Sequence, residues 1–460
     1  MAGRRSVKEN NGKGARRTLS RKIGTVIGSF SILIGALHFM GWGSSRRRGS
    51  LIRKAAHDAA AHNAMRKEVP HRSRLDDDDD EDPDNDKLTK QTELILSGAL
   101  NLVEINLSSE FRSSTKGTYQ GVTGGFCQLN FAAHKNDPSK YPMFRDLVAA
   151  SPDCQKSHVT LDLKYIAELA REFDAEMTEL GTKVPHAMEP TGFVFHESRC
   201  GSTLVANSLI GMDPKHHRVY SESAPPLQAL TACGEDYQSC DVEIAADLFR
   251  DVVYLMGRTN DAEESNLFFK IQSAGSKNIA TFQTAFPHTP WIFVYREPVQ
   301  VMMSQLRVAR IEQANCVRSR RSPPKRIKSL VQKIIREHAS DLDYEDYCAA
   351  HLAVICESAV KALQTSANGL AVNYNTLPDI LATTVLPKHF HVNVGDVEKR
   401  NIETVSQQYS KGRDNKKTEW KDDSEKKDAG ASEEIKTASA TFLQSSYDLL
   451  EELRQSHGIS

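Results

Sequence analysis

The chain has 460 residues, of which 39% are hydrophobic and 26% are charged, and its 59 Lys and Arg nearly balance its 60 Asp and Glu. The length favours two or three folding units. The near-neutral net charge excludes a uniformly basic nucleic-acid coat and a wholly acidic, solvated chain. Eight cysteines are too few for a miniprotein built on disulfides, but they allow a few disulfides in an oxidising compartment.

The first 43 residues have the charge pattern of a membrane anchor. Residues 1–22 contain eight Lys and Arg and one acid, for a net charge of +7, whereas the 21 residues 23–43 contain no charged side chain. A helix of about 20 residues spans the hydrocarbon core of a bilayer, so we expect a basic cytosolic tail followed by a transmembrane helix at 23–43. The alternatives are a cleaved signal peptide, whose apolar core would be shorter, and a buried soluble helix, which Arg46–Arg48 would not be expected to follow at once.

Eight cations before this span and five after it favour a cytosolic N-terminus. The prediction is therefore a single-pass type II membrane protein whose residues 44–460 lie in the secretory lumen. A glycosylation sequon, Asn106-Leu107-Ser108, agrees with this orientation. Cys233 and Cys240 are close enough in sequence for a short disulfide, but the pairing of the eight cysteines stays open and a fully reduced set is the alternative.

Residues 44–87 are interpreted as a disordered stem, because they run into a cluster of acids between positions 76 and 86, and like charges repel one another. A calcium site is the alternative, but the run lacks the spaced ligands and the Gly turn of such a site. Residues 88–185 are predicted to be mostly helical, from the apolar spacing at 88–111 and a helical pattern at 159–180. Their role stays open.

From residue 186 onward, short apolar runs alternate with helical patterns. The four runs lie at 192–195, 267–269, 291–295 and 370–374. Runs without polar alternation are typical of strands buried on both faces of a sheet. The predicted fold class is therefore α/β, with a parallel sheet flanked by helices over residues 186–460 and anionic ligands at the carboxyl ends of the strands.

The first run leads into Ser198–Leu204, where small and polar residues precede an apolar helix. Backbone N–H groups at a helix N-terminus can cradle an anion. Gly201 would let the backbone approach the anion, Ser202 and Thr203 add hydroxyl donors, and Arg199 adds a guanidinium. A nucleoside-triphosphate loop would have Lys at the position of Ser202, so an ATPase or GTPase is disfavoured. A strand–turn–helix joint without a ligand is the alternative.

Arg296 follows the third run, Pro298 suits the first turn of a helix, and Ser304 comes eight residues after Arg296. An arginine at the end of a strand and a hydroxyl on the next helix can converge on one phosphate. A structural arginine held in a salt bridge is the alternative.

Together these two elements resemble the sulfotransferase family, whose donor is 3′-phosphoadenosine-5′-phosphosulfate. Ser198–Leu204 is similar to the family's 5′-phosphosulfate loop, in the S-R-x-G-S-[ST] form of membrane-bound Golgi carbohydrate and tyrosylprotein enzymes. Arg296–Ser304 is similar to the R-[DE]-P-x5-S element that holds the 3′-phosphate. The resemblance covers about residues 190–381. It implies a P-loop fold and these donor-binding residues: Arg199, Cys200, Gly201, Ser202, Thr203, Leu204, Arg296 and Ser304.

The resemblance also implies catalytic roles for Lys270, beside the transferred sulfuryl group, and for Glu222 as general base. A base must deprotonate the acceptor hydroxyl or amine while cations stabilise the bridging oxygen. His196 and Glu197 are the alternative bases. No metal is expected, because Lys270, Arg199 and loop amides can neutralise the leaving phosphate.

Three further segments carry weaker signals. Tyr374 resembles a packing residue that follows the last strand in this family, and Lys411–Arg413 is similar to a basic adenosine-phosphate loop, within a polar run at 411–430 that we interpret as a surface loop. Residues 307–336 contain ten Lys and Arg and one acid. This basic segment is either a clamp for an anionic acceptor or a solvated loop and helix. Nucleic acid is not expected as a partner, because aromatic residues do not alternate with these cations.

The sequence therefore predicts a Golgi sulfotransferase that moves a sulfuryl group to a hydroxyl or amine, with a glycan as the first choice of acceptor. Sulfation of protein tyrosine and a catalytically inactive, membrane-anchored binding protein are the alternatives. Convergence of Lys270 and one acid beside Arg199–Thr203 would separate an enzyme from an inactive relative. The acceptor and the oligomeric state stay open.

Overall fold

The computed structural model describes residues 83–109, 111, 118–156, 158–408, 410–412 and 423–457. The predicted tail (1–22), the predicted membrane span (23–43) and most of the predicted stem lie outside these residues. Among the residues that are described, no helix is long and apolar enough to cross a membrane. Helix α2 (Pro83–Leu96) begins inside the segment 44–87 that was interpreted as a stem.

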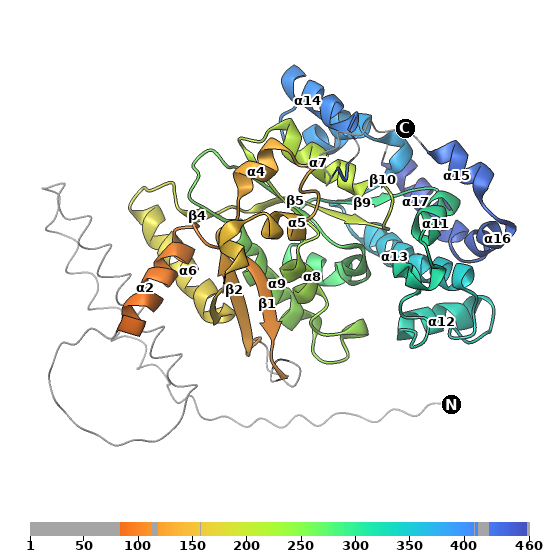
Figure 1. Cartoon of the computed structure of the whole chain (residues 1–460), viewed down its shortest axis with the longest axis horizontal. Coiled ribbons are helices and arrows are strands. Elements are labelled where there is room, and N and C mark those ends of the chain that lie inside the picture. Colours follow the sequence, from red (N-terminus) through yellow and green to blue (C-terminus); the bar gives the residue numbers. More distant parts are fainter. Residues whose placement is uncertain are drawn as a thin grey trace, which may run out of the picture. The chain divides into compact units, whose positions relative to one another are not determined.

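A five-stranded sheet, parallel throughout, forms the centre of the fold, in the strand order β10-β9-β5-β8-β6 (Figure 1). The strands are β5 (Pro190–His196), β6 (His217–Ser221), β8 (Asn266–Lys270), β9 (Trp291–Tyr295) and β10 (Gly369–Asn373). The predicted α/β class is confirmed, and each of the four predicted apolar runs forms a strand. Sequence analysis missed β6, since its alternation of polar and apolar residues does not form a run.

The order of the strands reverses direction at β5. After β5 the chain forms β6 and β8 on one side, and then crosses to form β9 and β10 on the other side. Ligands of open parallel sheets bind at such a reversal, at the carboxyl ends of the strands. This edge contains the last residues of β5, β8 and β9, which are His196, Lys270 and Tyr295.

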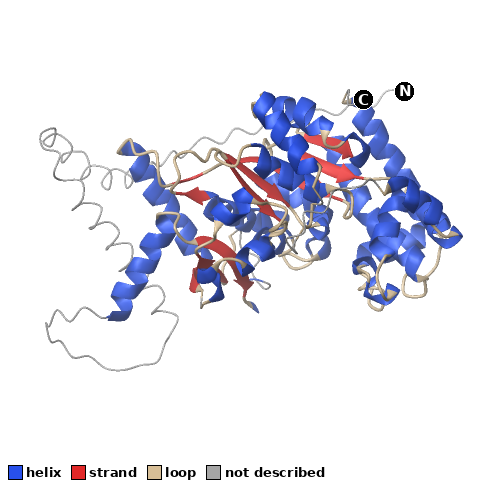
Figure 2. Cartoon of the chain, turned by 45° about the horizontal axis from the view of Figure 1, so that its top comes forward, coloured by secondary structure: helices blue, strands red, loops and turns tan. Residues whose placement is uncertain are grey.

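Helices cover both faces of the sheet (Figure 2). Phe193 and Phe195 of β5 belong to a large core with α9 (Val242–Gly257) and α13 (Tyr344–Thr365). Val194, between them, belongs to a second core with α7 (Ser202–Met212). Burial of successive residues on opposite faces explains why these strands are apolar at every position.

The remaining elements surround this layered arrangement. The α-helices are α4 (Phe131–Asn136), α5 (Phe144–Ala149), α6 (Leu163–Glu179), α8 (Ala224–Leu230), α10 (Ile279–Ala285), α11 (Pro298–Leu306), α12 (Lys325–Ile334), α14 (Asp396–Ser406), α15 (Ser424–Gly430), α16 (Glu433–Phe442) and α17 (Gln444–Ser456). The shorter or irregular helices are η1 (Pro152–Gln155), η2 (Glu235–Tyr237), η3 (Ser273–Asn278), η4 (Ile311–Gln313), η5 (Asn315–Val317), η6 (Tyr374–Thr376) and η7 (Leu381–His389). A two-stranded sheet pairs β4 (His186–Ala187) with β7 (Arg258–Thr259).

The segment predicted to be mostly helical, 88–185, contains a three-stranded antiparallel sheet. It consists of β1 (Asn101–Leu107), β2 (Val122–Cys127) and β3 (Val159–Asp162). The helical interpretation is correct for α2 and α6 but wrong for β1 and β3. Pairing with β2, which follows β1 by 15 residues in the chain, decides the conformation of β1, and no local spacing of apolar residues reveals such a partner.

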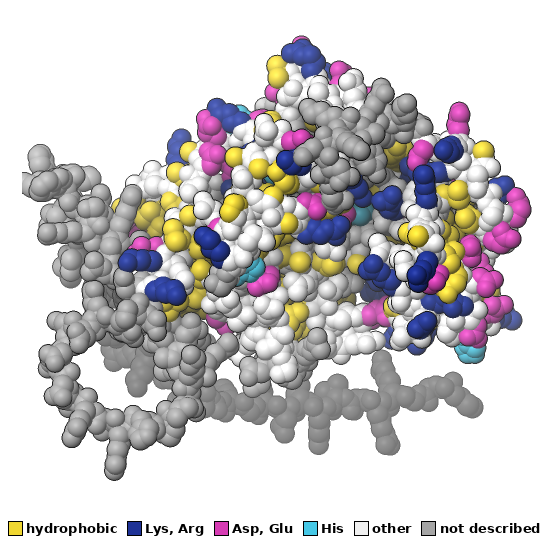
Figure 3. All heavy atoms as spheres, in the orientation of Figure 1, with side chains coloured by type: hydrophobic (Ala, Val, Ile, Leu, Met, Phe, Trp, Pro, Cys, Tyr) yellow, Lys and Arg dark blue, Asp and Glu magenta, His cyan; other side chains and the backbone are white. Residues whose placement is uncertain are grey.

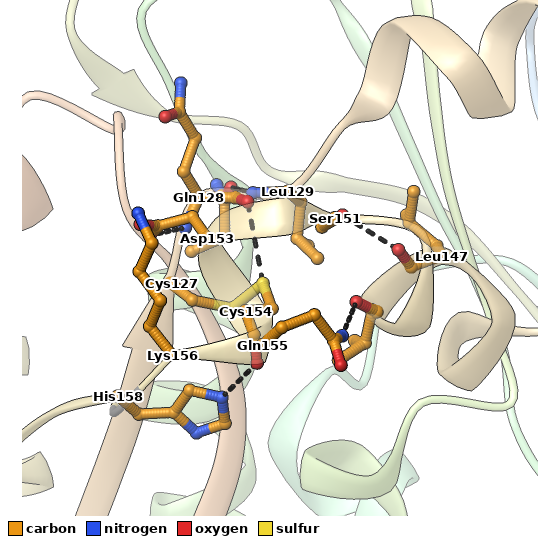
Figure 4. Close-up of a disulfide and its surroundings, with 12 residues drawn as sticks. Cys127, Gln128, Leu129, Leu147, Ser151, Asp153, Cys154, Gln155, Lys156 and His158 are labelled. Carbon is orange, nitrogen blue, oxygen red and sulfur yellow. Dashed lines mark hydrogen bonds and ion pairs between the residues drawn. A yellow bond between two sulfur atoms is a disulfide. The ribbon is translucent and has the colours of Figure 1, made fainter.

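Three disulfides lie within the described residues: Cys127–Cys154, Cys233–Cys240 and Cys316–Cys348. The short disulfide Cys233–Cys240, which the sequence allowed without deciding the pairing, is therefore present. Figure 4 shows the first of the three, which joins the end of β2 to the turn η1. The other two cysteines, Cys200 and Cys356, are reduced and buried.

The basic segment 307–336 is more ordered than a loop. Its helix α12 packs on α13 through buried Ile327, Leu330 and Val331, and the disulfide Cys316–Cys348 ties the preceding turn to α13. The cations of this segment are therefore held on a fixed surface.

Candidate functional site

The loop between β5 and α7, residues 197–201, has the backbone of an anion cradle. Ser198, Arg199 and Gly201 all have positive φ values of 99°, 56° and 82°. Runs of such residues turn successive N–H groups toward one point. The N–H groups of Ser202 and Thr203 follow in the first turn of α7, where no helical carbonyl is available to accept them.

The predicted loop residues divide into two groups. Arg199 is exposed and forms no ion pair within the described residues, and Ser202 and Thr203 are buried at the start of α7. Cys200 instead packs beneath the loop, where its thiol donates a hydrogen bond to the carbonyl of Val294 at 3.0 Å. The N–H of Leu204 is bonded to the carbonyl of Gly201 at 2.8 Å, so neither the Cys200 side chain nor the Leu204 amide faces a ligand.

Replacing Gly201 with Ala is expected to damage this loop. A methyl group there would lie 2.5 Å from Cδ2 of Tyr374, and the positive φ adds a steric cost of about 1–2 kcal/mol. We expect a fall in the free energy of unfolding of about 2 kcal/mol or more, measured by chemical denaturation. Gly181→Ala is the matched control, because Gly181 also has a positive φ but no atom within 4 Å of the added methyl. Equal losses in the two variants would contradict close packing of Tyr374 on the loop.

Arg296, directly after β9, lies in a second polar cluster. Its guanidinium donates to Gln300 Oε1 at 2.7 Å, to Ser424 Oγ at 2.8 Å and to Asp423 Oδ1 at 3.3 Å. The Nζ of Lys427 lies 2.7 Å from the same Asp423 oxygen. A carboxylate thus occupies a position between two cations, which is the arrangement that a phosphate group would require.

Tyr374 connects this cluster to the β5–α7 loop. The strand register pairs Asn373 with Tyr295, so the next residues, Tyr374 and Arg296, are neighbours. The Arg296 guanidinium lies 4.0 Å from the centre of the Tyr374 ring, and the same ring lies against Gly201. Sequence analysis interpreted Tyr374 as a packing residue, and the structure shows what it packs against.

The structure does not join Ser304 to Arg296 by a described contact. The Ser304 hydroxyl donates to the carbonyl of Gln300, one turn earlier in α11, at 2.9 Å. Gln300 is the residue of α11 that contacts Arg296, and sequence analysis missed it. Its position four residues after Arg296, near the start of the helix, was the available signal.

The predicted polar loop 411–430 is partly a helix. Residues 413–422 lie outside the described part, whereas Ser424–Gly430 form α15, which supplies Asp423, Ser424 and Lys427 to the Arg296 cluster. The interpretation as a surface loop is therefore wrong for 424–430. Its contacts with Arg296 span more than 120 residues of sequence, so no local pattern predicts them.

A third cluster joins the ends of three neighbouring strands. Lys270 ends β8 and pairs in register with Ser221, the residue before Glu222. The Lys270 ammonium donates to Glu222 Oε1, and Nε2 of His196, which ends β5, lies 3.6 Å from the same oxygen. The structure thus brings the predicted pair Lys270 and Glu222 into contact, and His196 lies two residues before the β5–α7 loop.

The charges of this cluster are set by burial and by its neighbours. Burial by itself would raise the pKa of Glu222, but the charge of Lys270 and its hydrogen bond to the carboxylate lower it to about 2. Burial and the nearby Lys270 lower the pKa of His196 to about 3, so its ring is neutral near pH 7. Glu222 is therefore a carboxylate that is held by a fully buried ammonium.

Neither ring nitrogen of His196 has a hydrogen-bond partner within the described residues, although the side chain is only 3% exposed. A buried polar group without a partner usually indicates a bound ligand or water. Lys411 also lies near enough for its charge to lower the pKa values of His196 and Glu222. Arg413, which was grouped with Lys411 in the sequence, lies outside the described residues.

Glu197 lies apart from this cluster. Its Oε2 accepts the backbone N–H of Arg296 at 3.3 Å, and its side chain also interacts with Cys356. Burial raises the pKa of Glu197 to about 8. Because Glu197 is fully buried and bonded to the start of α11, its contacts favour a structural role over that of a base.

Glu197 should make stability depend on pH. A carboxyl whose pKa is raised from 4.5 to about 8 by folding contributes stability that is fully present below pH 4.5 and is lost as the pH rises through about 8. We therefore expect the difference in melting temperature between Glu197→Gln and the wild type to shift in favour of the variant as the pH rises from about 5 to 8. Glu189→Gln, at an exposed position, is the control. A constant difference between Glu197→Gln and wild type across this range would show that Glu197 is already ionised at pH 5.

The sequence matches no protein-family model and no curated protein. The interpretation of the site therefore rests on its residues and their geometry.

Proposed function

We propose that the chain is a sulfotransferase that uses 3′-phosphoadenosine-5′-phosphosulfate as donor. The observation that carries this proposal is the contact between Lys270 and Glu222 at the carboxyl ends of β8 and β6, beside the anion cradle that follows β5. A buried cation and a carboxylate at that edge are suited to stabilising a leaving phosphate and to accepting a proton.

Two of the clusters suit the two phosphates of the donor. The N–H groups of residues 201–203 and the Arg199 side chain would hold the 5′-phosphosulfate. Arg296 and Lys427 would hold the 3′-phosphate, which takes the position of the Asp423 carboxylate. Tyr374 lies between these two clusters, so it would support both ends of the donor.

The reaction is a single in-line transfer. The acceptor oxygen or nitrogen forms a bond to sulfur while the bond between sulfur and the bridging oxygen breaks. The electron pair of the broken bond stays on the departing phosphate, where Lys270 and Arg199 stabilise the charge. Glu222 accepts the proton of the acceptor and later releases it to water.

The pair Lys270–Glu222 explains how a carboxylate of low pKa could act as a base. While Lys270 bonds to Glu222, the pKa of Glu222 is near 2 and the carboxylate is a poor proton acceptor. A bound donor offers Lys270 a second anionic partner. When the ammonium turns toward the bridging oxygen, Glu222 loses its main cation and becomes more basic.

A lumenal location in the Golgi fits this proposal. Three disulfides support an oxidising compartment. Asn106, in the glycosylation sequon, is exposed on β1 and thus accessible to modification. A type II anchor at 23–43 and a glycan acceptor complete the proposal, with protein tyrosine as the alternative acceptor.

The test is selective binding of 3′,5′-adenosine bisphosphate, the product form of the donor. We expect it to raise the melting temperature of the full chain in detergent, while equal concentrations of ATP or GTP have little effect. Absence of stabilisation in folded protein would contradict the sulfotransferase proposal. Stabilisation without transfer to any glycan or tyrosine acceptor would favour the inactive binding protein.

A further inference from the structure

A charged groove lies on the helical layer between α10, α12 and α13. It has a volume of about 650 Å³, and none of its lining residues belongs to the clusters around Glu222, Arg296 or the β5–α7 loop. Its charged lining residues are Lys277, Arg326, Lys333, Lys361, Asp236 and Glu357. Figure 3 shows Lys and Arg side chains gathered over α12 and the neighbouring helices.

Three of the four cations in this groove form no close ion pair within the described residues. Arg326 is neutralised by Asp236, at 2.6 Å. Lys277, Lys333 and Lys361 form no ion pair within 4.0 Å among the described residues. Lys277 is also partly buried, and this burial lowers its pKa. Glu235 acts electrostatically on Lys277, and Lys333 acts on Glu357, but neither carboxylate forms an ion pair within 4.0 Å. A partly desolvated ammonium without a close partner is costly, and an anionic ligand would offset that cost.

The groove is a built surface rather than a set of mobile side chains. The Glu235 carboxylate accepts the backbone N–H groups of Lys325 and Arg326, at 2.6 and 3.1 Å, and so caps the start of α12. The guanidinium of Arg326 donates to the carbonyl of Lys277, which joins α12 to η3. With the disulfide at Cys348 of α13, these contacts fix the spacing of the cations.

The other lining groups indicate the class of ligand. Gln283, Ser329, Ser358 and Thr365 supply amide and hydroxyl groups, which suit a sugar, and Tyr237 is the single aromatic residue that lines the groove. Single-stranded nucleic acids are usually bound by several aromatic side chains on which their bases stack. Lysines beside hydroxyls and amides suit carboxylate or sulfate groups on a carbohydrate.

The turn η3 connects this groove to the candidate active site. Ser276 accepts the backbone N–H of His196 at 3.2 Å, and the next residue, Lys277, lines the groove. Lys270 lies three residues before η3 begins. The segment 270–277 therefore joins the cluster of Lys270 and Glu222 to the groove along the chain.

We propose that this groove binds a uronate- or sulfate-bearing segment of the acceptor polysaccharide, away from the residue that is modified. This inference rests on the proposed transfer to a glycan and names its class as an anionic polysaccharide. Of the two interpretations of the basic segment 307–336, the clamp then applies, and it acts through Lys333 of α12.

The test compares two double variants of the full chain in detergent. Lys333→Gln with Lys361→Gln removes two exposed cations from the groove. Lys388→Gln with Lys399→Gln is the matched control, because both residues are exposed, on η7 and α14, outside the groove. Calorimetry measures the affinity for a heparin-derived hexasaccharide, with neutral maltohexaose, hexaglutamate and single-stranded DNA as comparison ligands.

We expect the groove variant to bind the sulfated hexasaccharide about five- to tenfold more weakly than the wild type, and the control variant to bind it within about twofold. Equal losses in both variants, or equal affinity of the wild type for hexaglutamate or DNA, would overturn the inference. The melting-temperature shift with 3′,5′-adenosine bisphosphate should be the same in both variants and the wild type. Hexasaccharide binding at the groove without any bisphosphate binding would support the inference about the groove and contradict the sulfotransferase proposal.

Discussion

Replacing Lys270 with Met is expected to lower the rate of sulfuryl transfer by about 10²–10³-fold, the usual effect of removing one donor that stabilises a developing negative charge. The Lys270 side chain is fully buried and lies at the end of β8, where it contacts Glu222. Affinity for 3′,5′-adenosine bisphosphate should fall less than the rate, because Arg199, the loop amides, Arg296 and Lys427 would still hold its two phosphates. Initial rates of labelled sulfate transfer to a pool of unsulfated glycans measure the first effect, and calorimetry measures the second.

A double variant separates the catalytic effect from loss of stability. Lys270→Met leaves the Glu222 carboxylate largely buried without its cation, which should lower the melting temperature. Adding Glu222→Gln removes that charge, so the double variant should recover melting temperature but not activity. Recovery of activity together with stability would show that the ion pair has only a structural role.

Replacing Arg296 with Ala is expected to weaken binding of 3′,5′-adenosine bisphosphate roughly ten- to a hundredfold, the range for a hydrogen bond to a charged group. The Arg296 guanidinium and the Lys427 ammonium lie in one cluster, where both contact the Asp423 carboxylate. Calorimetry with the bisphosphate measures the loss, and adenosine 5′-monophosphate, which lacks the 3′-phosphate, should show a much smaller change.

Asp423→Asn is expected to have the opposite effect, with affinity a few-fold higher than in the wild type. The Asp423 carboxylate bonds to both Arg296 and Lys427, so it competes with a phosphate for the same cations. Lys436→Gln, which breaks an exposed ion pair with Glu433 on α16, is the control and should leave binding unchanged. Weaker binding in Asp423→Asn would mean that the carboxylate orders the site rather than occupying it.

The parts of the fold that sequence analysis predicted are those with local signals. Strands β9 (Trp291–Tyr295) and β10 (Gly369–Asn373) are mostly apolar, because each is buried on both faces of the sheet. Gly201, followed by Ser202 and Thr203, indicates a strand–turn–helix joint from residue types alone. Lys270 and Glu222 were paired through a family resemblance, and the register of β8 and β6 explains their contact.

The remaining features depend on partners that are distant in sequence. Strand β1 was interpreted as part of a helix, since only its pairing with β2 determines that it is extended. The contact of Arg296 with α15 joins residues 128 positions apart, across a polar run that looks like a loop. Glu197 is adjacent to His196 in sequence, but its carboxylate accepts the backbone N–H of Arg296 and does not join the cluster of Glu222. No spacing rule assigns these contacts.

The ring of Tyr374 lies against Gly201 on one side and under the Arg296 guanidinium on the other. One rigid side chain therefore sets the separation between the two proposed phosphate sites. A ligand with both phosphates gains from each site only if its own phosphates have that separation. The site would thus select a nucleotide by its length as well as by its charge, and two unlinked phosphate compounds would not substitute for one nucleotide that carries both groups.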